Sequence, residues 1–288
     1  CELIRQWSTF HPEFAFLPRK FKIAVSALAE TDRAATAFHD IGVYIVKNDA
    51  GEIGYKIMVG GGLGRTPIIG SVIKEFLPKA DLIAYLEATL RVYNLHGRRD
   101  NKYKARIKIL VKALTPEVFA QKVEAEFAQI KDSMQVDAQL MADLDAVFTP
   151  PAYQDLPDLD LSAQFAAESK FANWYRHNTH AHKVSGYRIV TISLKRAGIA
   201  PGDLTDAEME LIADLADQYS FGELRNTHEQ NIVLADVPQS ALFDLWQTLE
   251  QHHMARAHIG FLTDIVCCPG GDFCSLANAK SIPIAEAI

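Results

Sequence analysis

The order of strand-like and helix-like patterns between residues 187 and 253 constrains the fold more than any other feature. Residues 187–194 have the pattern of a strand, and residues 205–219 that of a helix whose start, Thr205 and Glu208, matches a capping box. Two short strand patterns follow at 224–227 and 231–235, and then a helix pattern at 240–253. This β-α-β-β-α order is most of a ferredoxin-like unit and predicts an α+β protein.

The first half of the chain has its own strand and helix patterns. Strands are predicted at 21–26, 43–46 and 55–59, with a turn at 48–51, and helices at 79–96 and from Thr115 and Pro116 to about residue 130. Three prolines lie among acidic residues at 149–161, which indicates a linker and a domain boundary. We therefore expect domains at 1–150, 163–256 and 257–288, with a linker at 151–162.

Charge and cysteine usage narrow the function classes. The net charge of −7 argues against a general nucleic-acid binder, and the absence of a long apolar run predicts no membrane span. Three of the four cysteines fall within eight residues, which is not the distribution of a disulfide framework. A reducing, cytoplasmic setting with a metal or redox role is expected. The first residue, Cys1, and the last residues, 281–288, both suggest that the sequence is a piece of a longer protein.

Two basic stretches and one glycine loop could bind an anion. Lys20 and Lys22 lie two residues apart on a predicted strand, so they would share a face and attract an anion, although a solvated strand face is more common. Six basic residues fall within 98–108, which suits a nucleic-acid patch, a pocket for several carboxylates or a solvated helix face. The glycines at 60–64 would allow close approach to a ligand or form a plain tight turn.

The cysteine motif at 267–274 indicates a metal site. Five residues, among them a proline and two glycines, separate Cys268 from Cys274. Zinc sites and iron–sulfur clusters both use thiolates, and the chain offers too few cysteines to complete either site. His177, His180 and His182 form a second cluster that could bind a metal, but a polar loop before a strand is the more common explanation.

Taken together, these features resemble the sirohaem-dependent sulfite and nitrite reductase family, in its assimilatory hemoprotein branch. The resemblance covers nearly the whole chain and rests on the stretches 11–22, 60–67, 98–112, 221–225 and 268–280. It implies a sirohaem-binding domain at 1–150, a ferredoxin-like half domain at 163–256 and the start of a 4Fe–4S and sirohaem domain at 257–288.

The resemblance also implies roles for individual residues. Lys20 and Lys22 would face the bound anion, and Cys268 and Cys274 would be the first two ligands of a 4Fe–4S cluster. The residues expected at the sirohaem are Arg19, Lys104, Arg106, Lys108 and Ala277. Cys267 is adjacent to the ligand position and leaves a one-residue alternative open.

The implied reaction is the six-electron reduction of sulfite to sulfide, with nitrite reduction to ammonia as the close alternative. Ferredoxin or a flavoprotein reductase would supply electrons, and neither nucleic acid nor a membrane is expected as a partner. The family's second cysteine pair, Cys-x3-Cys, is absent from the 288 residues, so we expect the chain alone to be inactive. A non-catalytic module that binds a polyanion, or a zinc-binding structural domain, remain alternatives.

Overall fold

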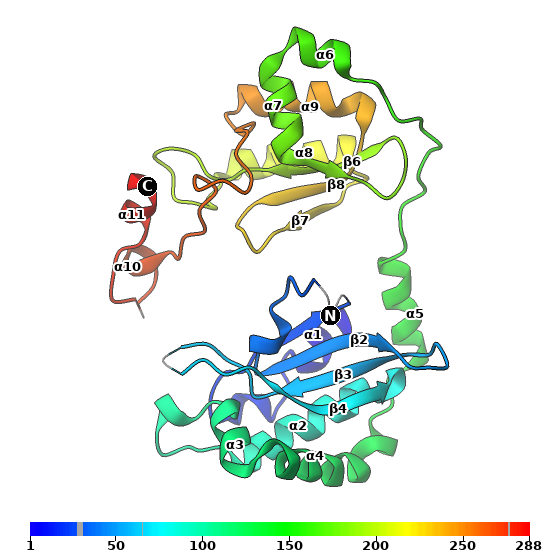
Figure 1. Cartoon of the computed structure of the whole chain (residues 1–288), viewed down its shortest axis with the longest axis vertical. Coiled ribbons are helices and arrows are strands. Elements are labelled where there is room, and N and C mark those ends of the chain that lie inside the picture. The colour runs from blue at the N-terminus through cyan, green and yellow to red at the C-terminus, as the bar shows by residue number, and fades with distance from the viewer. Residues whose placement is uncertain (28–30, 65, 276) are drawn as a thin grey trace. The chain divides into compact units, whose positions relative to one another are not determined.

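The computed structural model describes residues 1–27, 31–64, 66–275 and 277–288 of the chain. Two compact units, Cys1–Thr149 and Pro150–Ile288, divide these residues (Figure 1). Each unit has its own sheet and its own apolar core, and each is described by itself.

The sheet of the first unit has four strands in sequence order. They are β1 (Ile23–Ser26), β2 (Ile41–Lys47), β3 (Ile53–Val59) and β4 (Ser71–Pro78). β1 runs parallel to β2, whereas β2, β3 and β4 are antiparallel neighbours. The predicted turn closes the β2–β3 hairpin, where Gly51 has a φ of +80° and donates its N–H to the carbonyl of Asn48.

Helices cover one face of this sheet and form the core with it. They are α1 (Glu2–Ser8), α2 (Leu82–His96), α3 (Ile107–Leu114) and α4 (Pro116–Ile130), and the helix α5 (Ala138–Val147) follows them in the sequence. Short 3₁₀ turns occur at Phe14–Phe16, Thr36–Phe38, Lys79–Asp81, Lys102–Lys104 and Lys131–Ser133. Ile41, Val43 and Ile57 of the sheet pack against α2 and α4, which lie side by side below it in Figure 1. This burial of aliphatic and aromatic side chains is the main stabilising term of the unit.

The second unit is built on an antiparallel sheet of order β5-β6-β8-β7. Its strands are β5 (Thr179–Ala181), β6 (Tyr187–Ile192), β7 (Leu224–Asn226) and β8 (Ile232–Pro238). Its helices are α6 (Ser162–Ala167), α7 (Ser169–Asn178), α8 (Asp206–Tyr219), α9 (Leu242–Gln251), α10 (Gly270–Phe273) and α11 (Ile282–Ala287), with a 3₁₀ turn at Gln239–Ala241. Phe171, Trp174, Leu215 and Trp246 belong to the core that the helices form with the sheet.

The predicted order of elements in this unit is confirmed. β6, α8, β7, β8 and α9 follow one another as expected, and the capping box of Thr205 and Glu208 is present at the start of α8. The α+β class is correct, and the predicted start of α4 is also confirmed, because the Thr115 side chain accepts the N–H of Val118. The sequence patterns missed β4, α7 and β5. The two strands have no clear alternation, and the N-cap of α7 is Glu168, a residue type that is not among the usual N-caps.

The proline-containing segment at 150–161 has no helix or strand, yet it is held along the second unit. The Tyr153 hydroxyl donates to the buried carboxylate of Asp236 at 2.7 Å, and the Leu159 N–H donates to the side chain of Gln239 at 2.7 Å. Asp158 accepts the N–H of Gly186 at 2.9 Å. The segment is therefore an extended linker that is hydrogen-bonded to the second unit. Among the described residues no helix is both long and apolar enough to cross a membrane.

Candidate functional site

Lys20 and Lys22 lie in an extended segment just before β1. Both side chains are exposed, and neither has an ion-pair or hydrogen-bond partner among the described residues. The prediction that both stand on a strand is wrong, because β1 begins at Ile23. The Lys22 N–H bonds to a side chain, the carboxylate of Asp40 at 3.0 Å, instead of to a neighbouring strand.

Asp40 joins the two basic stretches of the first unit. It immediately precedes β2, beside the start of β1, and its side chain is 1% exposed. One carboxylate oxygen accepts the Lys22 N–H, and the other accepts Nε and Nη2 of Arg106 at 3.0 and 2.7 Å. A charge-assisted pair of this kind fixes the guanidinium firmly. Asp40 therefore holds the Lys22 backbone and Arg106 side by side.

Tyr93 of α2 makes a second link between the same stretches. Its hydroxyl lies 2.8 Å from the carbonyl oxygen of Ala105 and 3.2 Å from that of Arg19. Burial raises the pKa of Tyr93 to about 12, with the Asp40 carboxylate adding to the effect. The phenol therefore stays protonated and can donate at any ordinary pH. Sequence reasoning found neither Tyr93 nor Asp40, because an Asp before a strand and a Tyr on an apolar helix face are both common.

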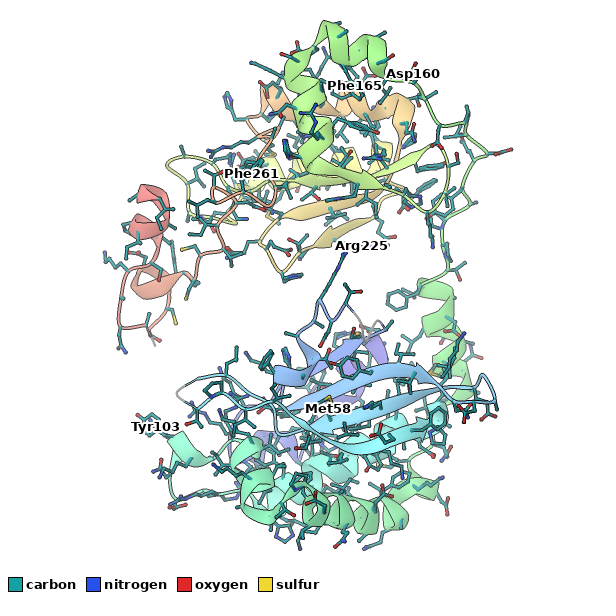
Figure 2. All side chains as sticks on the ribbon, viewed as in Figure 1. Met58, Tyr103, Asp160, Phe165, Arg225 and Phe261 are labelled. Atoms are coloured by element: carbon teal, nitrogen blue, oxygen red, sulfur yellow. The ribbon has the colours of Figure 1, made fainter. Side chains whose placement is uncertain are left out.

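The basic segment at 98–108 divides into paired and unpaired side chains. Arg98 pairs with Asp100, while Arg99 donates to the Phe16 carbonyl and to Asn94. Both arginines therefore have structural partners. Lys104 is exposed and has no partner among the described residues, and the neighbouring Tyr103, 82% exposed, projects outward (Figure 2).

The glycine loop is held by residues from this basic segment. The ammonium of Lys108 donates to the carbonyls of Leu63 and Thr66 at 3.0 and 2.7 Å, and burial, together with the charge of Arg106, lowers the pKa of Lys108. A Cβ on Gly62 would lie 2.9 Å from Nη2 of Arg106. At Gly62 the group that approaches the loop backbone closely is thus the guanidinium of Arg106. Arg65, within the same loop, lies outside the described residues.

Two polar contacts with side chains of α2 anchor the chain that leads into Lys20. Glu87 of α2, fully buried, lies 3.1 Å from the His11 ring and 3.0 Å from Arg91. Arg91 also lies 3.2 Å from Glu13. Residues 11–13 are therefore fastened to α2, and they limit the freedom of the lysine segment that follows.

In the second unit, the two adjacent cysteines have opposite environments. Cys268 is exposed and Cys274 is partly exposed, whereas Cys267 is buried, and all three are free thiols. Burial raises the pKa of Cys267, and the neighbouring Cys268 adds to this. A raised pKa disfavours the thiolate form that binds metals. Cys268 and Cys274 are therefore more accessible than Cys267.

The chain between Cys268 and Cys274 turns tightly around its glycines. Gly270 has a φ of +59°, and a Cβ there would lie 2.7 Å from the N atom of Ser281. Cys274 donates its N–H to the Gly270 carbonyl at 2.9 Å, and Ala277 donates to the Cys274 carbonyl at 3.1 Å. Ala277, the residue predicted to meet the sirohaem, thus lies one turn beyond Cys274. Leu276, also in the predicted stretch, lies outside the described residues.

The histidine cluster does not form a metal site. His177 lies in α7 near the Phe261 ring, His180 is exposed on β5, and the His182 side chain is buried, 3.1 Å from Asp236. The N–H of Val184 donates to His182 Nδ1, which leaves Nε2 to donate to Asp236. His177 thus lies in a helix, His180 in a strand and His182 in a loop. No group of three or more potential metal-binding side chains is found in the described part of the chain.

Family models match both units of the chain. Residues 1–131 match the "Nitrite and sulphite reductase 4Fe-4S domain", and residues 185–252 match the "Nitrite/Sulfite reductase ferredoxin-like half domain". The first match contains a single cysteine, Cys1, so the cluster in its description would take its thiolates from elsewhere.

Curated relatives carry both sulfite and nitrite reductase names. An assimilatory ferredoxin-dependent nitrite reductase of Haloferax mediterranei is 30% identical over 92% of the chain and 42% of its own length. A ferredoxin sulfite reductase of Mycolicibacterium paratuberculosis is 24% identical over 97% of the chain and 43% of its own length. The structure of the Mycobacterium tuberculosis NirA protein, 23% identical, has a TM-score of 0.69 over 99% of the chain and 45% of its own length, which shows a common fold. The chain spans less than half the length of these relatives.

Proposed function

Because the chain belongs to the nitrite and sulfite reductase family, whose cofactors are sirohaem and a 4Fe–4S cluster, we propose that it forms part of an enzyme that reduces sulfite to sulfide. The observation that carries this proposal is the pair of exposed, unpaired ammonium groups of Lys20 and Lys22, in a segment whose Lys22 N–H bonds to the same Asp40 carboxylate that holds Arg106. Such a set of cations suits a small, strongly charged oxyanion.

Lys20 and Lys22 are proposed to bind the anion and to deliver protons. Fixed positive charge stabilises the anion and the negative charge that develops as its oxygens leave. Each oxygen leaves as water and needs two protons, and an ammonium group within hydrogen-bond reach can supply one. Asp40 would hold the Lys22 backbone so that its side chain starts from a constant position.

Residues along the chain are proposed to hold the cofactors. The sirohaem, whose side chains are carboxylates, is assigned to Arg19, Lys104, Arg106 and Lys108, with Ala277 against the macrocycle. The donor chemistry suits this, since Lys104 is unpaired and Nη1 of Arg106 has no hydrogen-bond partner among the described residues. Lys108 already donates to two carbonyls and would have one N–H left to offer.

Cys268 and Cys274 are proposed as two of the four thiolate ligands of the cluster. Their exposure and their free thiols support this assignment, and the glycine turn between them lets the chain wrap around a bulky group. When bound, the two cofactors would provide the electron-transfer chemistry, and the external electron donor would supply the six electrons of the reaction. Because a 4Fe–4S cluster takes four thiolates, we expect the 288-residue chain by itself to hold no complete cluster and to be inactive.

Nitrite reduction to ammonia is the second candidate. The relative from Haloferax mediterranei, which is 30% identical, is named a nitrite reductase, and the same cations would attract either anion. The names of the relatives also support ferredoxin as the electron donor, with a flavoprotein reductase as the alternative. The proposed location of the protein is the cytoplasm.

Substitution of the lysines in the cofactor-loaded parent protein tests the proposal. Lys20→Ala and Lys22→Ala should each lower kcat/KM for the preferred anion by about 10²-fold or more, as expected when a proton donor or an electrostatic contact to the reacting group is lost. The visible absorption spectrum should stay unchanged. Comparing kcat/KM for sulfite and for nitrite in the unsubstituted protein decides between the two substrates.

Lys47 provides the matched control for these variants. It is an exposed lysine at the opposite end of β2 from Asp40, and Lys47→Ala should leave turnover unchanged. If Lys20→Ala and Lys22→Ala turned over both anions as fast as Lys47→Ala does, the anion-binding role would be wrong. Loss of the visible spectrum would make the lysines structural instead.

A further inference from the structure

The side-chain amide of Gln230 makes two hydrogen bonds to the backbone of the buried Cys267. Its side-chain Nε2 donates to the Cys267 carbonyl at 2.8 Å, and its Oε1 accepts the Cys267 N–H, also at 2.8 Å. The amide of one side chain thus satisfies both backbone groups of a residue 37 positions away. No other side chain among the described residues bonds to the Cys267 backbone.

The turn that presents Gln230 is itself strained. Gln230 lies between β7 and β8 and has a φ of +59°, a conformation that residues other than glycine rarely adopt. The Thr227 N–H donates to the Asn231 carbonyl at 2.9 Å and closes the turn. A conformation that costs energy persists where the surrounding contacts compensate for it, and the two bonds to Cys267 are such contacts.

The next residue holds the same loop at a second point. Asn231 is 2% exposed, and its Nδ2 donates to Asp264 at 2.9 Å, while its Oδ1 accepts the Leu194 N–H at 3.1 Å. Lys195 pairs with Asp264 at 2.9 Å in the same buried group. The chain leading into the cysteines is therefore fixed at two points. Asn231 and Lys195 hold Asp264, and Gln230 holds Cys267.

This geometry points to Gln230 as a positioning residue that decides which of two adjacent thiols is offered to the cluster. With its backbone clamped, Cys267 turns its thiol inward, where Sγ lies 3.2 Å from the Cys268 carbonyl, and Cys268 is left exposed. The inference rests on the proposed function for the identity of the metal group. The selection between the thiols, however, is a property of this chain and can be measured without any cofactor.

Thiol labelling of the 288-residue chain tests the inference. Cys1→Ser, Cys268→Ser and Cys274→Ser together leave Cys267 as the single thiol, and iodoacetamide is the probe. In this background Gln230→Ala should speed the labelling of Cys267 roughly tenfold or more, because two hydrogen bonds that keep the segment closed are lost. Gln230→Gly should give the same result while keeping the turn, since glycine adopts a positive φ without strain.

Gln239→Ala is the matched control. Gln239 also makes two hydrogen bonds through its side-chain amide, to Leu159 and Asp158, in the same unit but away from the cysteines. In the variant that keeps Cys267 as its single thiol, Gln239→Ala should leave the rate of Cys267 labelling unchanged. Labelling of Gln230→Gly at the parent rate, with unchanged circular dichroism, would overturn the inference, whereas the lysine experiment above would be unaffected by that result.

Discussion

At the scale of single residues, Asp40 is the side chain on which the arrangement of the basic site depends. Its carboxylate is almost fully buried and serves two donors that come from separate stretches of sequence, the Lys22 N–H and the Arg106 guanidinium. A buried carboxylate is stable only where such partners replace its hydration. The two basic stretches are therefore joined by one negative charge.

Substituting Asp40 should lower the free energy of unfolding, although Asp40→Asn hardly changes the shape of the side chain. Asp40→Asn keeps an acceptor for Lys22 but removes the charge that Arg106 faces, so the free energy of unfolding should fall by about 1–3 kcal/mol. Denaturant unfolding measures this. Asp100→Asn, at the exposed pair with Arg98, is the control and should have no detectable effect. Equal effects of the two substitutions would contradict the structural role given to Asp40.

The roles of individual basic residues depend on partners that are remote in sequence. The density of charge at 98–108 was visible in the sequence, but Arg99 bonds to the Phe16 carbonyl and Arg106 to Asp40, 83 and 66 positions away. Periodicity and spacing carry no information about such pairs. The roles of Lys20, Lys22 and the two cysteines at the cofactors stay predictions.

At the scale of elements, local signals predicted the second unit best. The capping box set the start of α8, and Tyr187 begins β6 as the alternation indicated. β1 was predicted to start two residues too early, because alternation continues into Phe21 although the Lys22 N–H bonds to Asp40 instead of a strand. Elements that are set by packing, such as α7 and β5, left no comparable signal.

A buried histidine near the end of the second unit should make its stability depend on pH. His258 lies 2.6 Å from the Ser193 hydroxyl and 2.8 Å from that of Thr263. Burial, with the charges of Arg256 and Lys195, lowers the pKa of His258 to about 4, against a smaller opposing effect of Asp264. Between pH 6.5 and 4 the unfolded chain therefore binds a proton that the folded chain does not.

The free energy of unfolding should consequently fall as pH is lowered through that window, by at most about 1.4 kcal/mol per pH unit from this group. His258→Gln should give a shallower dependence between pH 6.5 and 4, measured by denaturant unfolding at several pH values. His180→Gln, at an exposed position on β5, should leave the dependence as it is. An unchanged slope in His258→Gln would show that His258 is not the group responsible.

At the scale of the whole molecule, each of the two compact units carries residues that we propose as binding residues. The first unit has the unpaired cations, and the second has the exposed Cys268 and the partly exposed Cys274 at the two ends of a glycine turn. Both units match the family, and the chain spans less than half the length of the relatives. We therefore propose the activity for a larger protein to which these residues contribute.

The measurement that tests this account most directly is the iron and acid-labile sulfide content of cysteine variants of the cofactor-loaded parent protein. Cys268→Ser and Cys274→Ser should each lose the cluster iron and its visible absorption, because a cluster requires its thiolate ligands. Cys267→Ser, the adjacent buried thiol, should keep both. Full cluster content in Cys268→Ser and Cys274→Ser, or its loss only in Cys267→Ser, would contradict the assignment.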